Sequence, residues 1–511
     1  MVAYLGMDIG TSGTKALVLA EDGRVLAAAE AAHPIYTPKP GWSEQIPEDW
    51  WQSAITATRA VIKKAKLRGA EISGIGLSGQ MHGSVFLDAR GTILRPALLW
   101  NDQRTAEQCL QITQLAGGRD ALLQMVANPA LTGFTAPKIL WLRQHEPKRY
   151  AKLAQVLLPK DYIRYRLTGE YATEVSDASG TLLLDVKRRG WHIGLVEKLG
   201  LDPLILPKVW ESAEISGVLT TKAAAEFGLQ PGTPVVGGAG DQAAGAVGTG
   251  VVSAGLISAS MGTSGVIFAA SDEPRTDPIG RVHTMCHAIP STWCVFGCML
   301  SAGGSLQWLR NTLFADQIAT LQRSKKDLGK LYPLMMQRAA AAEAGCENLF
   351  FLPYLTGERC PHADPYATGC FVGLTPRHGQ AELIRSVVEG ITFGMTEQVG
   401  ILREMGVAIK QVRASGGGAR SEFWRQLQAD MYNAPVVTVN ASEGAALGAA
   451  VLAGVGVGAW RDVAAATRAV ISVESVCRPN RKAAILYQQQ LTKYASLYNA
   501  LRDSFAKLAT Q

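Results

Sequence analysis

Apolar runs and short polar turns alternate at the start of the chain, and this pattern predicts a β-meander. The apolar run at 4–9 ends in the turn Gly-Thr-Ser-Gly at 10–13, and a second run follows at 16–19. A turn of two acidic residues and a glycine at 21–23 leads into a third run from residue 25. Runs of about four to eight apolar residues bounded by glycine and polar residues are typical of strands. We therefore expect three successive strands, the first two forming a hairpin.

The same strand–turn–strand pattern returns in the second half of the chain. An apolar run at 256–261 meets another Gly-Thr-Ser-Gly turn at 262–265, and a further apolar run follows at 266–268. The two turns lie about half the chain length apart, so we interpret them as an internal repeat. The duplication predicts two similar halves with a ligand cleft between them, where small-molecule sites often lie.

Strands alternate with helices along the rest of the chain, which favours an α/β architecture. Apolar runs at 72–77 and 84–87 predict strands, and the pattern at 50–66 predicts a helix that begins near Pro47. From 485 to 508, apolar residues recur at steps of four and three. That spacing is the apolar stripe of a long helix, and we expect it to pack onto a domain.

Length and composition indicate a folded protein of two domains. A chain of 511 residues is too long for one core, so we expect domains at 1–250 and 251–511. Hydrophobic residues make up 47% and charged residues 18%, as in packed globular proteins. The net charge of +7 suits anionic ligands such as nucleotides and sugar phosphates. The basic clusters at 63–66 and 187–189 are short and lack interleaved aromatics, so we expect no nucleic-acid partner.

The sequence also bears on the compartment. It has no basic start with a cleavage site, and no apolar stretch of about 20 residues is free of charge. The eight cysteines are too sparse for a disulfide scaffold, and we expect buried thiols in a reducing compartment. These observations predict a cytoplasmic protein without a membrane partner, and they leave a homodimer open.

The two glycine-rich turns are candidate phosphate loops. Their glycines allow backbone N–H groups to point at phosphate oxygens, and their hydroxyls add further donors. An ordinary β-turn is the alternative for either loop alone, whereas two loops facing one cleft could hold a polyphosphate from both sides. The candidate phosphate-binding residues are Gly10, Thr11, Ser12, Lys15, Gly262, Thr263 and Ser264.

Asp8 stands immediately before the first loop and would meet bound phosphates. A carboxylate in that place needs a cation, and Mg²⁺ held through water is the natural one. The alternative is a strand-end aspartate without a ligand. A third glycine-rich turn at 416–418 opens a helix predicted at 422–432. Its bare backbone leaves room for a flat ring, which suits adenine, although such a turn is often only flexible.

Two glycine strings resemble dinucleotide fingerprints, but their contexts exclude that function. The string at 74–79 is followed by a strand pattern at 81–87 rather than by a helix. The string at 238–243 places Asp241 at a helix start, where a pyrophosphate would be repelled. The phosphate-loop pattern of nucleoside triphosphatases is also absent, because Gly329-Lys330 is followed by leucine.

Asp241 has two interpretations from local sequence, which we weigh equally. A carboxylate at a helix start that faces a cleft stays ionised and can accept a proton from a substrate hydroxyl. An aspartate that only caps the helix is the alternative. Arg359 and His362 are further candidates for the cleft, although the pair Glu358–Arg359 has the pattern of a structural contact. The small-residue segment at 443–450 predicts a helix start that lets two helices approach closely.

Taken in order, these motifs resemble the FGGY carbohydrate kinases of the actin and hexokinase superfamily. Residues 133–145 and 369–389 are similar to the two family signatures, and the likeness spans nearly the whole chain. The resemblance implies two actin-like (ribonuclease H-like) α/β domains with a ligand cleft between them. The segment at 78–83 looks like the sugar-binding segment of the branch that acts on ketopentoses. Three further stretches that look like this branch are 42–45, 99–104 and 158–181.

The resemblance implies a reaction as well as a fold. ATP with Mg²⁺ is the phosphoryl donor, Asp241 accepts the hydroxyl proton, and Asp8 is the acid that handles MgATP. The implied acceptor is D-xylulose, phosphorylated at its 5-hydroxyl, with another ketose or a polyol as the alternative. The alternative from a different functional class is a protein that binds nucleotide and changes conformation but performs no sugar chemistry. By this resemblance the sugar-binding residues are Gln80, Met81, His82, Asp241 and Gln242, and the adenosine turn is Gly416, Gly417 and Gly418.

Two positions depart from the family pattern. Gln242 stands where asparagine usually follows the catalytic aspartate, and the longer amide can shift a sugar contact. Cys360 stands where threonine is expected. Neither change touches the phosphate loops, so the reaction class is better specified by the sequence than the sugar is.

Overall fold

The chain forms two compact units, each assembled from several segments. The structure, a computed structural model, describes residues 2–324, 327–441 and 444–509. Unit 1 comprises 1–253, 270–294 and 441–472, and unit 2 comprises the remaining segments at 254–269, 295–440 and 473–511. The expected division at residue 250 thus differs from the compact units, because segments 270–294 and 441–472 of the second half pack with unit 1.

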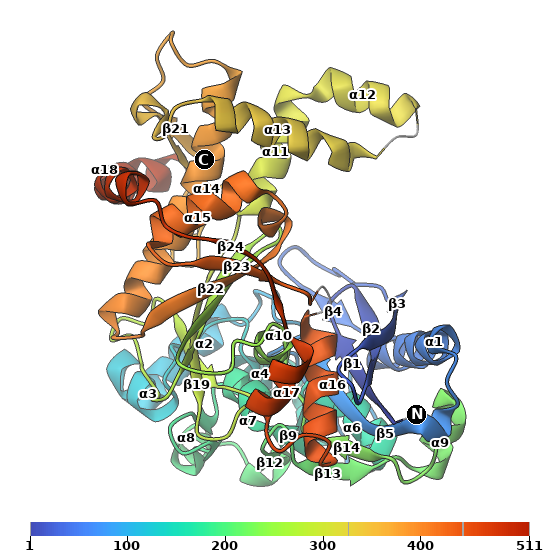
Figure 1. Cartoon of the computed structure of the whole chain (residues 1–511). Helices are drawn as coiled ribbons and strands as arrows, with labels where there is room; N and C mark the ends of the chain where they lie inside the picture. The colour runs from blue at the N-terminus through green and yellow to red at the C-terminus, as the bar shows by residue number, and fades with distance from the viewer. Residues whose placement is uncertain (1, 325–326, 442–443, 510–511) are drawn as a thin grey trace. The chain divides into compact units, whose positions relative to one another are not determined.

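A mixed sheet forms the centre of unit 1 (Figure 1). Its first three strands are the predicted meander, paired antiparallel, and β5 is added parallel to β1. In sheet order the strands are β13 (Ile215–Val218), β14 (Pro234–Val236), β5 (Ile72–Gly79), β1 (Ala3–Ile9), β2 (Gly13–Ala20) and β3 (Val25–Ala32), with β15 (Ala239–Gly240) also paired to β5.

Alternate residues of β1 bury their side chains on opposite faces of this sheet, as the period of a strand requires. Leu5 and Met7 join the core formed with α1 (Pro47–Ala65), whose Trp50 is fully buried. Burying such a side chain contributes roughly 1.5–3 kcal/mol. Tyr4 faces the other way, into a core formed with α16 (Gly444–Gly456) and α10 (Asp241–Gly248). Asp8 continues the alternation of Tyr4 and therefore lies on the α10 and α16 face.

Glycines on β1 and β5 allow α16 to lie directly on the sheet. A Cβ at Gly6 would overlap the carbonyl oxygen of Ala446, and one at Gly76 would overlap that of Ala449. Figure 1 shows the orange-red α16 beside the blue strands β1 and β5, which lie at the opposite end of the sequence. The glycine string at 74–79 therefore serves close packing, and its strand conformation confirms that it is no dinucleotide fingerprint.

Unit 2 repeats the sheet of unit 1. The hairpin of β16 and β17 carries the second Gly-Thr-Ser-Gly turn, and β22 is added parallel to β16 as β5 is to β1. The common order and directions confirm the internal repeat. In sheet order the strands are β19 (Trp293–Met299), β17 (Gly265–Ser271), β16 (Gly255–Met261), β22 (Ile409–Gly416), β23 (Val436–Val439) and β24 (Val473–Cys477).

The remaining helices cover the sheets and fill the insertions. In unit 1 they include α2 (Ala106–Ala116), α3 (Arg119–Val126), α4 (Thr135–His145), α6 (Pro159–Thr168), α7 (Val175–Ala178), α8 (Ile193–Lys198), α9 (Thr221–Phe227) and α17 (Val463–Val470). In unit 2 they include α11 (Gly303–Leu313), α12 (Ala315–Arg323), α13 (Leu331–Ala341), α14 (Gln380–Glu404), α15 (Glu422–Tyr432) and α18 (Arg481–Leu508).

The predicted helices at 50–66, 422–432 and 485–508 correspond to α1, α15 and α18, and the last begins four residues earlier than its apolar stripe. The predicted strand at 84–87 is the short β6 (Val85–Leu87). Residue 443 of the predicted small-residue helix lies outside the described residues. Across the described ranges, none of the helices has both the length and the apolar character needed to cross a membrane.

We predict that the contact between α10 and α16 tolerates no added methyl group. A Cβ at Gly448 would overlap the carbonyl oxygen of Ala244, which is backbone and cannot rotate away. Gly448→Ala should therefore lower the stability of unit 1 by about 1–3 kcal/mol. The measurement is the first transition in differential scanning calorimetry.

Gly245→Ala on α10 is the matched control, because a Cβ there meets no atom within 4 Å. It should leave stability unchanged or raise it by up to about 1 kcal/mol, the helix preference of alanine over glycine. Equal transitions for the two variants would contradict the close approach.

Candidate active site

Three motifs singled out from sequence meet at one edge of the unit 1 sheet. The parallel strands β1, β5 and β15 end side by side, with Ile9 opposite Gly79 and Gly79 opposite Gly240. The residues that follow these three ends are the first Gly-Thr-Ser-Gly loop, Gln80 and Asp241. Ligands of α/β sheets bind beyond the carboxyl ends of parallel strands, so this edge is the candidate site.

Asp8 is held from both neighbouring strands. It lies opposite Lys15 on β2 and opposite Ser78 on β5. The Ser78 hydroxyl donates to Asp8 Oδ1 at 2.9 Å. Burial raises the pKa of Asp8, the Ser78 hydrogen bond and the charge of Lys15 lower it, and the charge of Glu30 raises it, with a net rise. Asp8 is half-buried, so the carboxylate keeps a path to solvent or to a ligand.

Asp241 is the first residue of α10 and does not cap it. The cap position is Gly240, and no side chain accepts a cap hydrogen bond there, so the capping alternative is excluded. Burial and the negative charge of Asp8 raise the pKa of Asp241 to about 7. Hydrogen bonds from the backbone N–H and the side chain of Gln242 lower this pKa and offset part of the rise. Asp241 is half-buried like Asp8, and the two carboxylates form a like-charged pair.

The first Gly-Thr-Ser-Gly loop is held in shape by hydrogen bonds from the buried Gln45 and the half-buried Trp100. The N–H of Gly10 donates to the carbonyl of Gly13 at 3.0 Å and closes the turn. Gln45 donates to the Thr11 carbonyl at 2.7 Å, and Trp100 donates to the Thr11 hydroxyl at 3.0 Å. Ser12 is exposed at the tip. The loop therefore presents a fixed backbone rather than a flexible one.

Gln80, Met81 and His82 have different surroundings, although sequence grouped them as sugar contacts. Gln80 is 1% exposed, and its amide donates to Gln45 Oε1 at 2.8 Å while its carbonyl accepts from Thr11. It supports the phosphate loop from within the unit. The Met81 side chain lies against Gly240, the residue before Asp241. His82 has a left-handed backbone with φ of 68°, and its Nδ1 lies 2.7 Å from the Gly180 carbonyl.

The second Gly-Thr-Ser-Gly loop lies in unit 2 and is held by the start of α11. The N–H groups of Ala302 and Gly304 donate to the Thr263 carbonyl at 2.9 and 3.0 Å, and that of Gly303 donates to the Gly262 carbonyl at 2.9 Å. Gly262 and Thr263 are exposed, and Ser264 is half-buried. Carbonyl oxygens of this loop thus point at the helix.

The glycine turn at 416–418 lies beside this second loop. Met261 ends β16 directly opposite Gly416 at the end of β22, so the two glycine-rich turns share one sheet edge of unit 2. Gly416 has φ of 76°, and a Cβ there would overlap the Met261 carbonyl. Gly417 is exposed, whereas Gly418 is buried against the Met261 side chain. Glycine is required here by both conformation and space.

The further candidates Arg359 and His362 also lie in unit 2, where Cys298 interacts both with Ser264 of the second loop and with the charge of Arg359. The Glu358 carboxylate accepts from the Arg359 N–H at 2.7 Å, which is a local turn contact. The His362 ring stacks on Tyr498 at 3.5 Å, and burial lowers its pKa to about 4. Cys360 is buried beside Gly297. These contacts are those of a packed core.

Sequence reasoning did not assign Ser78, Gln45 and Trp100 to the support of Asp8 and the first loop. Ser78 carries a signal that could have been used, because it follows Gly74 and Gly76 at a spacing of two and therefore faces α16. Gln45 and Trp100 carry no comparable local signal. Their contacts with the loop arise only when distant segments fold together.

Comparison with known proteins shows the family of the chain. The model for the N-terminal domain of the FGGY family of carbohydrate kinases matches residues 3–248, and the model for the C-terminal domain matches 257–457. The chain is 40% identical over 451 residues to a xylulose kinase of Escherichia coli, which covers 88% of this chain and 89% of the relative. It is 37% identical over 503 residues to a xylulose kinase of Bacillus subtilis, with 98% of each covered.

A solved structure extends the likeness to three dimensions. The crystal structure of a xyloylose kinase from Brucella ovis has a TM-score of 0.88 at 36% identity, and the alignment covers 98% of this chain and 99% of that one. The paired sheets, the repeated glycine-rich loops and the family matches lead to one conclusion: the chain belongs to the FGGY family of carbohydrate kinases and has its two-domain α/β fold.

Proposed function

We propose that the protein transfers the γ-phosphoryl group of MgATP to the 5-hydroxyl of D-xylulose, with Asp241 as the proton acceptor. Support for the sugar comes from the relatives, several of which are named xylulose kinases and align over nearly the whole chain. Support for the role of Asp241 comes from its place at the sheet edge.

The observation that carries the proposal is the effect of Asp8 on Asp241 at one edge of the unit 1 sheet, where Asp8 lies on β1, Asp241 follows β15, and β5 lies between the two strands. A general base works best when its pKa lies near the working pH. Burial and the charge of Asp8 raise the pKa of Asp241 to about 7, which meets that condition. A carboxylate at the start of a helix can also remain charged after substrate excludes water, because the helix N-terminus favours negative charge.

The same pair fits a magnesium ion. Burial raises the pKa values of both half-buried carboxylates, and the charge of Asp8 raises that of Asp241 further; a divalent cation relieves both effects. In the described part of the chain, no group of three or more His, Cys, Asp or Glu side chains is arranged to hold a metal ion. Mg²⁺ bound with a nucleotide needs only one or two carboxylates, since phosphates and waters complete its shell. We assign Asp8 to this role, acting through water.

The residues of the chain then divide the reaction between them. Mg²⁺ supplies charge neutralisation of the phosphates when it is bound. Phosphoryl transfer passes through a largely dissociative transition state, so the protein mainly positions the reactants. Lys15 and the first loop hold phosphate oxygens near the end of β1. Asp241 orients the sugar hydroxyl and takes its proton as the new P–O bond forms.

We assign the nucleotide to the glycine-rich turns. In unit 2 the loop at 262–264 and the turn at 416–418 end adjacent parallel strands, which suits a phosphate chain and an adenosine on neighbouring backbone. Gly416 and Gly417 are exposed, so a ring can lie against their backbone.

We assign the sugar to Met81, His82 and Gln242, with Gln80 supporting the phosphate loop. Met81 lies against the turn that carries Asp241, so a sugar that contacts it has a hydroxyl close to the base. The Gln242 side chain hydrogen-bonds to Asp241 in place of the usual asparagine. This longer amide is the specific feature that favours the second candidate, a kinase of the same family acting on another ketose or a polyol.

Asp241→Ala should lower kcat for sugar phosphorylation by about 10²–10⁴-fold, because the hydroxyl proton loses its acceptor. The dissociation constant of an ATP analogue should change little. A coupled ADP-release assay and an equilibrium titration measure the two quantities. Asp22→Ala at an exposed turn is the control, and a wild-type rate in Asp241→Ala would exclude the assignment.

Asp241→Asn should stabilise the folded protein more at pH 8 than at pH 5. The pKa of Asp241 is raised on folding, so the folded state favours the proton and loses stability as pH rises through about 7. Asparagine cannot ionise, so the variant does not lose folding stability in this way as the pH rises. Melting temperatures from pH 5 to pH 8.5 test the effect, with an expected gain of a few °C at the upper end.

Asp22→Asn is the control, since hydrogen bonds from Arg24 lower the pKa of Asp22, so this carboxylate is ionised in both the folded and unfolded states from pH 5 to pH 8.5 and its replacement should change stability equally across that range. A difference between Asp241→Asn and wild type that does not change with pH would refute the raised pKa.

A panel of ketopentoses, ketohexoses and polyols should show the highest kcat/KM for D-xylulose. A sugar that lacks one of the matched hydroxyls should have a much lower kcat/KM, because its binding leaves polar groups of the site without a hydrogen-bond partner. If another member of the panel ranks first while Asp241→Ala still abolishes turnover, the reaction stands and the sugar assignment is replaced.

A further inference from the structure

The backbone that leads into Asp241 is held by an internal polar network that the reaction itself does not use. Residues 237–240 connect β14 to α10, and each end of this short segment is hydrogen-bonded. The N–H of Gly238 donates to the Ser212 carbonyl at 2.8 Å, and the Gly237 carbonyl accepts from the guanidinium of Arg164. The N–H of Gly240 donates to the Ser176 hydroxyl at 3.1 Å. This last bond lies one residue from the proposed base.

The hydroxyl of Ser176 is oriented by Glu174. Ser176 donates its proton to Glu174 Oε1 at 2.9 Å, which leaves a lone pair of the same oxygen for the Gly240 N–H. A serine hydroxyl has only one proton to donate. Because Ser176 donates it to the Glu174 carboxylate, its oxygen can only accept in the hydrogen bond with the Gly240 N–H. Ser176 is 1% exposed and Glu174 is 0% exposed, and water does not compete for these bonds.

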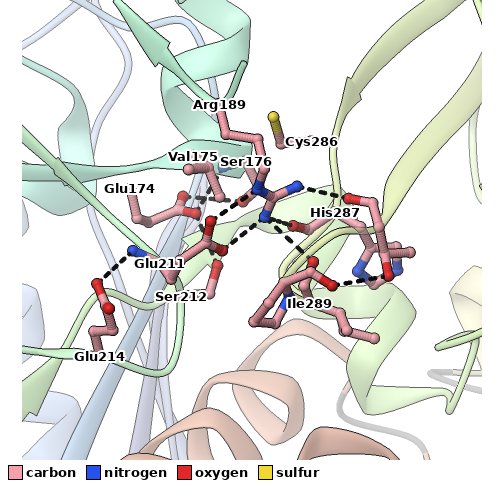
Figure 2. Close-up of polar contacts among 12 residues, drawn as sticks. Glu174, Val175, Ser176, Arg189, Glu211, Ser212, Glu214, Cys286, His287 and Ile289 are labelled. Atoms are coloured by element: carbon pink, nitrogen blue, oxygen red, sulfur yellow. Dashed lines mark hydrogen bonds and ion pairs between the residues drawn. The ribbon is translucent and has the colours of Figure 1, made fainter. Parts of the chain in front are cut away.

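Glu174 also holds the other end of the segment. Its Oε2 accepts from the Ser212 hydroxyl at 2.9 Å, and Ser212 in turn accepts the Gly238 N–H through its carbonyl. Figure 2 shows Glu174 between Ser176 and Ser212, the two residues through which it reaches the strand end. One buried carboxylate therefore supports both Gly238 and Gly240.

Glu211, the residue before Ser212, is also held in place by hydrogen bonds. Arg189 donates to both carboxylate oxygens of Glu211 at 2.8 and 2.7 Å, and it also donates to the carbonyls of His287 and Ile289 (Figure 2). A bidentate pair of this kind adds geometric definition as well as energy. Two contacts therefore constrain the position of Ser212: the ion pair of the preceding residue, Glu211, with Arg189, and the hydrogen bond from Ser212 to Glu174.

The turn that contains Ser176 reaches the sugar segment too. Helix α7 is followed by Ser179–Thr181, and the Gly180 carbonyl lies 2.7 Å from His82 Nδ1. The same short stretch thus contacts the backbone before the proposed base and a proposed sugar contact. A displacement of α7 would change the distance between Asp241 and its substrate.

Charges beneath α7 account for the carboxylate at position 174. Lys160, fully buried, pairs with Asp161 at 2.6 Å and Asp177 at 3.0 Å, and it lies 3.5 Å from Glu174. Buried ion pairs contribute little to stability compared with apolar packing. Among the described residues, Asp161 Oδ2 and Asp177 Oδ1 of this cluster have no hydrogen-bond partner, whereas both oxygens of Glu174 are hydrogen-bonded. Glu174 also accepts the N–H groups of Ser176 and Asp177 at 2.7 and 2.8 Å.

From these contacts we propose that Ser176 is a positioning residue for Asp241, holding the Gly240 N–H through a hydroxyl that Glu174 orients. The proposal rests on Asp241 as the proton acceptor. It predicts that loss of the hydroxyl moves the base relative to the sugar while the nucleotide sites in unit 2 are unaffected.

The test is Ser176→Ala in the full-length protein. One lost hydrogen bond that positions a base corresponds to about a tenfold fall in kcat for D-xylulose phosphorylation. KM for ATP should stay within about twofold of wild type. Ser176→Thr, which keeps the hydroxyl, should recover most of the rate. Ser216→Ala is the matched control, because this buried serine of unit 1 donates only to the Val235 carbonyl at 3.1 Å.

A double-mutant cycle separates positioning from general damage. If Ser176 acts through Asp241, adding Ser176→Ala to Asp241→Ala should leave the residual rate unchanged, whereas independent effects would multiply. Residual turnover is followed at high enzyme concentration over hours. A tenfold further loss in the double variant, or a Ser176→Ala rate within twofold of Ser216→Ala, would overturn the proposal.

The outcomes also distinguish this inference from the proposed function. A wild-type rate in Asp241→Ala removes the base assignment, and the positioning role is removed with it. A strong loss in Asp241→Ala together with a normal rate in Ser176→Ala leaves the base in place and removes only the role of Ser176.

Discussion

The site depends on one unfavourable interaction, that between two carboxylates at the same sheet edge, one on β1 and one after β15, with β5 between these strands. Asp8 and Asp241 both have pKa values raised by burial, and the charge of Asp8 adds to the rise at Asp241. Such a pair is costly for folding and useful for chemistry, since one carboxylate can meet a cation and the other can take a proton near neutral pH. The surrounding structure must therefore hold both groups in place against their repulsion.

Close packing of small residues is what brings these groups to one edge. Gly6 and Gly76 allow α16 to lie on the sheet, and Gly448 allows α10 to lie on α16. Asp241 begins α10, so its position follows from these backbone contacts. Unit 2 has the same strand order, and there too the glycine-rich turns follow the ends of adjacent parallel strands. The duplication explains why both Gly-Thr-Ser-Gly loops occupy equivalent places in their own units.

Polar contacts complete what the packing begins. Gln45 and Trp100 define the first loop, while Glu174 and Ser212 support the strand end before Asp241. Buried polar networks of this kind are favourable only when nearly every member is satisfied, and they then specify a single geometry. The interior polar groups of unit 1 thus serve the orientation of the site more than the net stability of the fold.

Local pattern in the sequence was sufficient for the strands of the meander, the helices α1, α15 and α18, the internal repeat and the family. Period and turn chemistry are encoded within a few residues, so these features need no long-range information. Tertiary structure alone decided that α16 packs with unit 1, that Asp241 starts its helix without capping it, and that Gln80 supports a loop. It also placed the Ser176 hydroxyl within hydrogen-bond distance of the Gly240 N–H. These facts depend on the parallel register of β1, β5 and β15, which residues far apart in the chain establish by packing together.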